Sequence, residues 1–204
     1  MTNWITQLDF SVLYRVQDAL KCAFLDFLMP KITFLGNTGL IWLLWAGVLL
    51  LFPKHRRTGI LLLAGLGVGV LIGNVAMKNL FARSRPCWID TAVPLLISVP
   101  KDFSFPSGHT LSSVIAATVL TAADRRFAAF AVPLAALIAF SRLYLFVHFP
   151  TDVLASVILG IAVGVTVWKF GGRGLDRMAS RTATPKNEPK QSKTRRQDNA
   201  PTHR

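Results

Sequence analysis

Long apolar blocks separated by short polar segments dominate this chain. Several of the blocks approach the length of about 20 residues that a helix needs to cross a bilayer. Their alternation with polar connections predicts an all-α fold, a polytopic membrane helix bundle. The apolar blocks are residues 34–52, 58–77, 110–123, 127–147 and 149–170.

The first 33 residues follow a different pattern. Apolar residues such as Trp4 are interleaved with charged ones such as Asp9, which is typical of an amphipathic helix lying at the membrane interface. A less polar piece, residues 22–29, follows, and we expect it to end at Pro30. The pattern is compatible both with an interfacial helix and with a first membrane helix.

At the other end, apolar periodicity is lost from residue 171 onward. Residues 171–204 contain nine Lys and Arg residues against three acidic ones. Such a composition buries too little apolar surface to fold, so we expect a disordered basic tail that contacts anionic lipid headgroups. The chain is thus expected to comprise an N-terminal segment (1–33), a membrane core (34–170) and this tail.

Composition favours a membrane protein over a soluble one. Hydrophobic residues make up 52% of the 204 residues, charged residues only 16%, and the mean hydropathy is +0.45. Much of the formal net charge of +13 lies in short loops and in the tail, where the positive-inside rule expects it. The positive charge therefore predicts no nucleic-acid partner.

The basic clusters also predict an orientation. Residues 54–57 and 125–126 are basic, as is the tail, and we expect all three on the cytoplasmic side. The connection 78–109 and the turn around His148 then fall together on the outer face. Several Lys and Arg residues in that connection break the charge rule, and an anion bound there would account for them.

Glycine repeats predict where helices pack closely. Gly65, Gly69 and Gly73 recur at four-residue intervals, and Gly160 and Gly164 form a second pair. Small residues on one helix face let a neighbouring helix approach. A nucleotide-binding glycine loop would need a preceding strand, which the pattern lacks. We therefore interpret these glycines as helix-packing positions.

The stretch Phe103–His109 does not fit a membrane helix, because it brings Pro106, Ser107, Gly108 and His109 between two apolar blocks. Pro106 ends the preceding structure, and Ser107 is a good N-cap for the helix that follows. A helix start offers free N–H groups and a positive dipole end to an anion, and Gly108 permits close approach. A phosphate site is expected here, with a histidine beside it to move a proton.

Two further clusters of chemically active residues are expected on the same face. One contains Lys78 and Arg85, and the other contains Arg142, His148 and Asp152. Charged groups at membrane-helix ends are costly unless they pair or serve a substrate. A single residue of this kind is often a cap or a snorkelling side chain, but three clusters on one face indicate a site.

The three clusters resemble the signature motifs of the type 2 phosphatidic acid phosphatase family, the integral-membrane lipid phosphatases. The resemblance covers roughly residues 34–170. It implies about six helices, for which residues 1–33 would have to supply one crossing. The matching positions are Lys78, Arg85, Pro86, Pro106, Ser107, Gly108, His109, Ser141, Arg142, His148 and Asp152.

The residue types at these positions suit phosphoryl transfer. A phosphate or pyrophosphate ester needs its charge neutralised and its oxygens held in line with a nucleophile. Lys78, Arg85 and Arg142 supply cationic donors, and Ser107 with the Gly108 amide completes a cradle for the phosphate.

The resemblance implies that His148 attacks phosphorus to form a phosphohistidine, while His109 protonates the departing oxygen. Asp152, four residues after His148, is expected to accept from the other ring nitrogen and fix the tautomer. Water then hydrolyses the phosphoenzyme, with His109 as base. The sequence has no carboxylate cluster that suggests a metal, so we expect a reaction that needs neither metal nor cofactor.

Three charged residues near the motifs keep alternative roles. Arg83 can steer substrate or contact lipid headgroups, although we favour a structural role at the outer surface. Asp90 and Asp102 either form salt bridges with the basic site or are solvated.

As a function we favour a lipid phosphatase that acts in the cell membrane on undecaprenyl pyrophosphate. This choice rests on the resemblance to compact family members and on the expected outward-facing site. Phosphatidate and phosphatidylglycerophosphate are alternative substrates, and transfer of phosphate to a lipid acceptor is an alternative reaction. A lipid-binding or transport protein is the non-enzyme alternative, but binding alone would not require His109, His148 and Asp152 together.

Overall fold

The computed structural model describes residues 4–175, which are helical apart from their connecting loops. The prediction of an all-α bundle is confirmed. Residues 176–204, most of the expected tail, lie outside the described part. The helices are α1 (Trp4–Leu20), α2 (Ala23–Leu35), η1 (Asn37–Gly39), α3 (Leu40–Leu51), α4 (Arg56–Gly69), η2 (Val70–Met77), α5 (Lys78–Phe81), α6 (Pro86–Ile89), α7 (Gly108–Ala123), α8 (Arg125–Tyr144), α9 (Pro150–Thr166) and η3 (Val167–Gly171).

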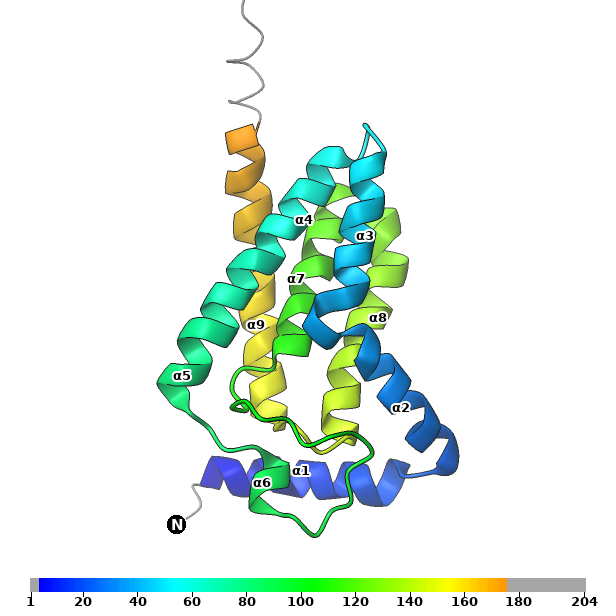
Figure 1. Ribbon diagram of the computed structural model, residues 1–204, viewed down its shortest axis with the longest axis vertical. Coiled ribbons are helices and arrows are strands. Elements are labelled where there is room, and N and C mark those ends of the chain that lie inside the picture. Colours follow the sequence, from blue (N-terminus) through cyan, green and yellow to red (C-terminus); the bar gives the residue numbers. More distant parts are fainter. Residues whose placement is uncertain (1–3, 176–204) are drawn as a thin grey trace, which may run out of the picture.

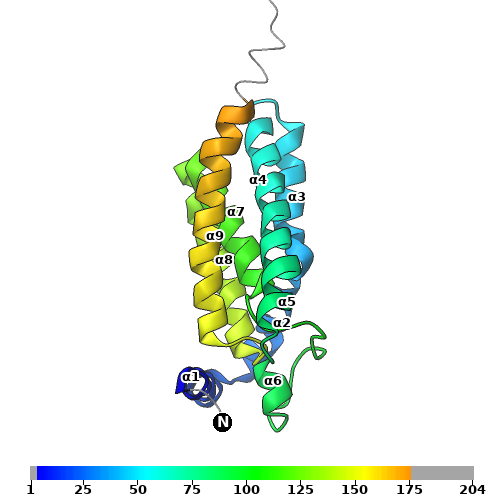
Figure 2. The ribbon, with the colours of Figure 1, turned by 90° about the vertical axis from the view of Figure 1, so that its left-hand side faces the viewer.

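Helix α7 lies at the centre of the bundle and packs against α4, α8 and α9 (Figures 1 and 2). Glycines make these contacts close. A Cβ atom on Gly69 would come within 2.6 Å of Ile115, and one on Gly164 within 2.7 Å of Thr118. The predicted glycine packing faces are confirmed, and both lie against α7.

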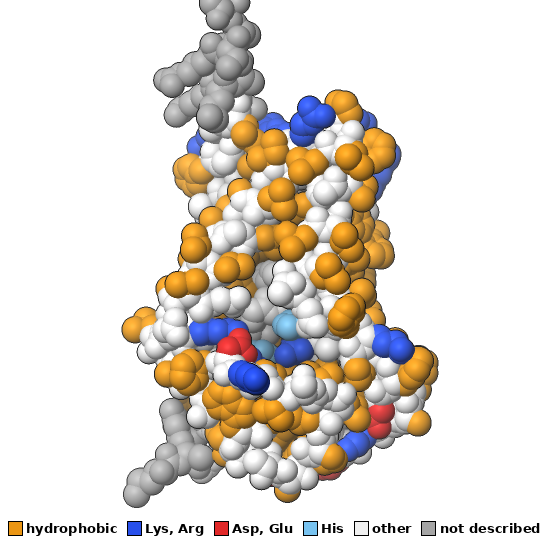
Figure 3. All heavy atoms as spheres, in the orientation of Figure 1, with side chains coloured by type: hydrophobic (Ala, Val, Ile, Leu, Met, Phe, Trp, Pro, Cys, Tyr) orange, Lys and Arg blue, Asp and Glu red, His pale blue; other side chains and the backbone are white. Residues whose placement is uncertain are grey.

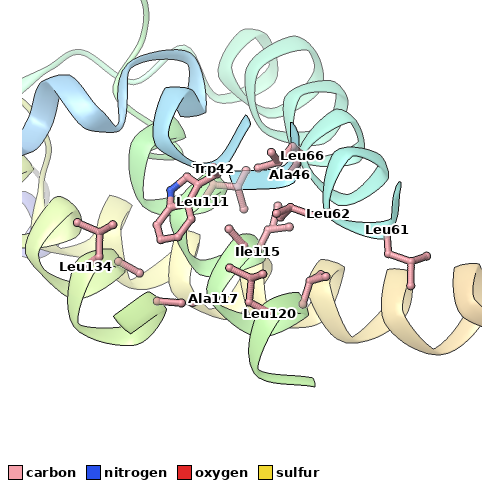
Figure 4. Close-up of a cluster of buried hydrophobic side chains, with 14 of the residues drawn as sticks. Trp42, Ala46, Leu61, Leu62, Leu66, Leu111, Ile115, Ala117, Leu120 and Leu134 are labelled. Atoms are coloured by element: carbon pink, nitrogen blue, oxygen red, sulfur yellow. The ribbon is translucent and has the colours of Figure 1, made fainter. Parts of the chain in front are cut away.

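A buried apolar cluster connects α7 to its neighbours (Figure 4). Trp42 of α3, Leu62 of α4 and Ile115 of α7 are fully enclosed. The indole N–H of Trp42 donates to Ser113 Oγ at 2.9 Å, so its polar atom is satisfied inside the core. This packing fixes α7, and with it the helix start at Gly108, relative to the rest of the bundle.

The long sides of the bundle are covered by large apolar side chains (Figure 3). Among the described residues, three helical stretches are long and apolar enough to cross a bilayer: Arg56–Ile89, Arg125–Tyr144 and Pro150–Leu175. The bent pair α2–α3 would make a fourth. Helix α7 is shorter, with 16 residues. The chain is therefore a multi-pass membrane protein.

The pair α2–α3 is bent by 47°. Two left-handed residues, Thr38 (φ 51°) and Gly39 (φ 73°), redirect the chain there. Pro30, where we expected a helix to end, lies inside α2, so that expectation is wrong. A proline removes only one backbone donor, and α2 continues past it to Leu35. The bend brings η1 against the central helix α7.

The connections that carry the basic clusters and those that carry the candidate site lie at opposite ends of the bundle, as we predicted from the distribution of charge. The α3–α4 loop and the end of α9 lie at one end, and the α5–α7 connection and the α8–α9 turn lie toward the other (Figure 1). Helix α1 crosses that second end at a steep angle to the bundle (Figures 1 and 2). Which side of the membrane each end faces stays a prediction.

Candidate active site

A cavity of about 710 Å³ lies between the α2–α3 bend and the α4–η2 helix. It appears as a hollow on the long side of the bundle, where histidine, basic and acidic side chains meet (Figure 3). The structure brings residues from all three predicted clusters to this cavity. Six of the predicted site residues line it: Lys78, Arg85, Gly108, His109, Arg142 and His148.

Asp102, from the loop before α7, pairs with two of the residues that were predicted to bind phosphate. Its Oδ1 accepts from Arg85 Nη2 at 2.7 Å, and its Oδ2 pairs with Lys78 Nζ. Of the two alternatives for Asp102, the salt bridge is thus confirmed. Both cations are almost fully buried, whereas the carboxylate is 55% exposed. An anion therefore already occupies the position where these two residues converge.

The charges around Asp102 keep its carboxyl ionised. Burial alone would raise its pKa, but the hydrogen bond from Lys78 and the positive charges of Arg85 and Lys78 outweigh burial and lower the pKa to about 2. The site thus stabilises a negative charge strongly, as a phosphate-binding site must.

His148 lies in the turn between α8 and α9 and is 1% exposed. Arg85 Nη1 lies 3.0 Å from its Nε2 and also donates to the Val147 carbonyl at 2.7 Å. Burial, followed by the positive charges of Arg85 and Arg142, lowers the pKa of His148 well below its ordinary value. The imidazole is therefore neutral at neutral pH.

Asp152 and Ser104 lie at the other side of the His148 ring. Asp152 Oδ2 is 3.7 Å from Nδ1, longer than a hydrogen bond, while Ser104 Oγ is 3.4 Å from Nδ1 and donates to Asp152 Oδ2 at 2.5 Å. The direct hydrogen bond that we expected from Nδ1 to Asp152 is thus replaced by contacts through Ser104. Ser104 lies within the Phe103–His109 stretch, but a serine between two phenylalanines gave no separate signal.

His109, in the first turn of α7, contacts the bend between α2 and α3. Its Nε2 lies 2.9 Å from Asn37 Oδ1, and Gly36 leaves so little space that a Cβ atom there would come within 2.7 Å of the ring. Asn37 accepts at this distance, so the histidine nitrogen donates. Sequence reasoning missed Asn37, because a polar residue beside a glycine reads as an ordinary turn.

Arg142 is 3% exposed and donates through Nη1 to Thr33 Oγ1 of α2. Its Nε is buried and has no hydrogen-bond partner within the described residues. A buried donor without a partner is costly, so this guanidinium has capacity for an anionic ligand in the cavity.

Ser107 caps α7, as predicted. Its Oγ accepts from Thr110 N at 3.5 Å and from Thr110 Oγ1 at 3.0 Å, and the side chain is fully buried. Gly108 lines the cavity beside Asn74, where a Cβ atom would come within 3.0 Å of Oδ1. Direct contact of Ser107 with a phosphate stays a prediction.

Arg83 and Asp90, whose roles the sequence left open, both have side-chain partners. Arg83 donates to Asp152 Oδ1 at 2.5 Å and to Asp9 Oδ2 at 2.7 Å. Asp90 accepts from Tyr14 Oη at 2.7 Å.

Across residues 4–175, no group of three or more His, Cys, Asp or Glu side chains is arranged to hold a metal ion. Independence from metals stays a prediction.

Comparisons with known proteins agree with the motifs. A sequence profile described as the PAP2 superfamily matches residues 57–174. An undecaprenyl-diphosphatase of Sulfolobus acidocaldarius is 34% identical over 121 residues, which are 59% of this chain and 58% of the relative. The chain thus spans about three fifths of that relative. Phosphatidylglycerophosphatase B of Bacillus subtilis is 31% identical over 184 residues, 83% of this chain and 86% of the relative.

The fold also matches a solved structure. The crystal structure of a transmembrane PAP2 type phosphatidylglycerolphosphate phosphatase from Bacillus subtilis superposes with a TM-score of 0.66 at 27% sequence identity. The match covers 87% of this chain and 88% of that structure. The likeness therefore includes nearly the whole described bundle.

Proposed function

Because the chain belongs to the PAP2 superfamily, we propose that it is a lipid phosphatase that removes phosphate from a lipid phosphate or pyrophosphate through a phosphohistidine. One observation carries the proposal: His148 lines the cavity, and its Nε2 lies 3.0 Å from Arg85 Nη1. The proposed nucleophile, His148, thus lies next to a proposed phosphate-binding cation, Arg85.

In the proposed reaction, the substrate phosphate displaces the carboxylate of Asp102 from Lys78 and Arg85. Arg142 adds its unpartnered donor, and the Gly108 amide at the start of α7 adds the helix dipole. These groups neutralise the phosphate oxygens and hold them around phosphorus.

The Nε2 lone pair of His148 then attacks phosphorus, and the bond to the leaving oxygen breaks. His109 supplies a proton to that oxygen. Asp152 stabilises the positive charge that develops on the His148 ring, through Ser104 Oγ at 2.5 Å. Water then attacks the phosphohistidine, with His109 accepting its proton, and inorganic phosphate leaves.

We propose undecaprenyl pyrophosphate as the substrate. The undecaprenyl-diphosphatase relative supports this choice, as does the proposed orientation with the site at the outer face and the basic tail in the cytoplasm. Phosphatidylglycerophosphate is the second candidate substrate. Phosphatidylglycerophosphatase B aligns with 83% of this chain, whereas the undecaprenyl-diphosphatase aligns with 59%.

The test is a phosphate-release assay with purified protein in detergent, comparing undecaprenyl pyrophosphate, phosphatidylglycerophosphate and phosphatidate, each with and without EDTA. We expect release from the pyrophosphate to be fastest and EDTA to leave it nearly unchanged. Faster release from phosphatidylglycerophosphate would select the second candidate.

Full loss of activity with EDTA, restored by a divalent ion, would contradict the metal-independent mechanism. His148→Ala is the control for contaminating phosphatases. No release by the wild type from any of the three lipids would contradict the proposed function itself.

A further inference from the structure

Helix α1 carries a carboxylate that faces the bundle. Asp9 is 2% exposed, whereas Trp4 and Leu8 on the same helix are 69% and 56% exposed. A buried carboxylate is unfavourable unless it is paired and hydrogen-bonded. The residues that pair with Asp9 therefore help to determine the position of α1.

Both oxygens of Asp9 bind at the start of α9. Oδ1 accepts from the Thr151 backbone N–H at 3.0 Å, and Oδ2 accepts from Thr151 Oγ1 at 2.6 Å and from Arg83 Nη2 at 2.7 Å. The N–H groups in the first turn of a helix have no partner within the helix, and a carboxylate there also interacts well with the helix dipole. Asp9 thus fastens α1 to the helix that carries Asp152.

Arg83 connects the two carboxylates. Its Nη2 donates to Asp9, while its Nη1 donates to Asp152 Oδ1 at 2.5 Å and to Thr151 Oγ1 at 2.8 Å. The guanidinium also lies over the ring of Phe149, 4.1 Å from its centroid. A planar fork with two terminal nitrogens can hold both carboxylates in a fixed relation, which a single ammonium cannot.

This arrangement determines how Asp152 faces the histidine. Arg83 holds Oδ1, so Oδ2 is directed to Ser104 Oγ at 2.5 Å and to the Phe149 N–H at 2.9 Å. We propose that Asp9, acting through Arg83, is a positioning residue that orients Asp152 and thereby the attacking imidazole of His148. The inference rests on the proposed function, in which His148 is the nucleophile.

Asp9 lies before residues 57–174, the part of the chain that the family profile matches. The amphipathic N-terminal helix therefore contributes to the reaction as well as to the fold. Arg83, for which we favoured a structural role at the outer surface, connects α1 to the catalytic carboxylate.

The test compares Asp9→Asn with Asp18→Asn in the purified full-length protein. Both changes remove one negative charge from α1, but Asp18 is exposed. Rapid quench with undecaprenyl pyrophosphate labelled in its terminal phosphate measures phosphoenzyme formation, and steady-state kinetics separate kcat from KM. We expect Asp9→Asn to lower phosphoenzyme formation and kcat about tenfold with KM unchanged, and Asp18→Asn to change neither.

A double-mutant cycle separates positioning from a structural role. In an Asp152→Asn background, Asp9→Asn should cause no further loss of rate, because its effect passes through Asp152. The same tenfold loss in both backgrounds would overturn the proposal, as would an Asp9→Asn rate equal to that of Asp18→Asn.

If Asp9→Asn does not fold, Arg83→Lys provides the test, since it keeps the charge but loses the fork. A rate equal to the wild type would overturn the proposal, and a loss of about tenfold that disappears in the Asp152→Asn background would support it. The proposed function fails on a different result, namely a wild-type protein that forms no phosphoenzyme.

Discussion

Arg85 Nη1 lies 3.0 Å from His148 Nε2. A guanidinium has donors only, so Nε2 accepts and the proton of the neutral ring is on Nδ1, facing Ser104. The lone pair that would attack phosphorus therefore accepts a hydrogen bond from Arg85, and attack requires that this donor turn to a phosphate oxygen. The contact with Arg85 thus fixes both the tautomer of His148 and the orientation of its imidazole ring.

Substitution of His148 and of His109 should impair the reaction in different ways. His148→Ala should abolish phosphate release and leave no acid-labile phosphate on the protein. His109→Ala should slow phosphatidate hydrolysis about a hundredfold or more, but pyrophosphate hydrolysis less, because a lipid alcohol leaves poorly without a proton. Acid-labile phosphate trapped during turnover is the measurement. Its presence on His148→Ala and absence from the wild type would show that another residue is the nucleophile.

In the proposed reaction, Asp102 competes with substrate for Lys78 and Arg85. Asp102→Asn should therefore lower KM, and the inhibition constant of inorganic phosphate, by about tenfold, or about 1.4 kcal/mol of binding free energy. Because the pKa of Asp102 is about 2, the carboxylate is ionised throughout pH 5–9 and the difference from the wild type should be constant there.

The matched control is Asp90→Asn, which removes a charge from the same connection but contacts Tyr14 instead of the site. Unchanged phosphate inhibition in Asp102→Asn would mean that the carboxylate and the phosphate do not share a position.

The buried neutral His148 should make stability depend on pH. Its folded-state pKa lies well below its ordinary value because of burial and the neighbouring Arg85 and Arg142, whereas in the unfolded chain it titrates near pH 6.5. Below about pH 6.5 the unfolded state binds a proton that the folded state does not. The free energy of unfolding should therefore fall as pH decreases through that value and be fully retained above it.

The measurement is the Tm of the wild type and of His148→Asn between pH 8 and pH 5. The wild-type Tm should fall relative to that of the variant as the pH is lowered. A constant difference between the two proteins would contradict a neutral folded-state imidazole.

The orientation in the membrane can be tested with single cysteines. In a background without Cys22 and Cys87, a membrane-impermeant thiol reagent added to intact cells should label Thr91→Cys but not Arg125→Cys. Both positions are exposed; Thr91 lies in the α6–α7 connection, and Arg125 begins α8 at the opposite end of the bundle. Labelling of Arg125→Cys alone would reverse the topology and remove the support for an outer-leaflet substrate.

Features encoded by nearby residues could be predicted from the sequence. Ser107 caps α7 because a serine precedes an apolar run, and Gly69 and Gly164 lie against α7 because small residues recur on one helix face. The cations of the site could be predicted as well, since charges at the ends of membrane helices are costly without a purpose.

Contacts between distant segments could not be predicted. Asn37 and His109 are separated by 72 positions, and Asp9 and Arg83 by 74. Asp9 has the sequence context of a surface position on an amphipathic helix, and only the fold shows that its face is turned inward. The continuation of α2 past Pro30 could not be predicted either, because the residues that bend the chain, Thr38 and Gly39, lie eight and nine positions later.

The cavity between the α2–α3 bend and α4 opens on the apolar flank of the bundle (Figure 3). In the proposed function, a lipid phosphate would insert its headgroup from the side while its hydrocarbon chain stays among the other lipids. The protein would then meet its substrate by lateral diffusion in the plane of the bilayer. Its rate should follow the mole fraction of substrate in the bilayer, so that dilution with neutral lipid slows turnover while dilution with buffer does not.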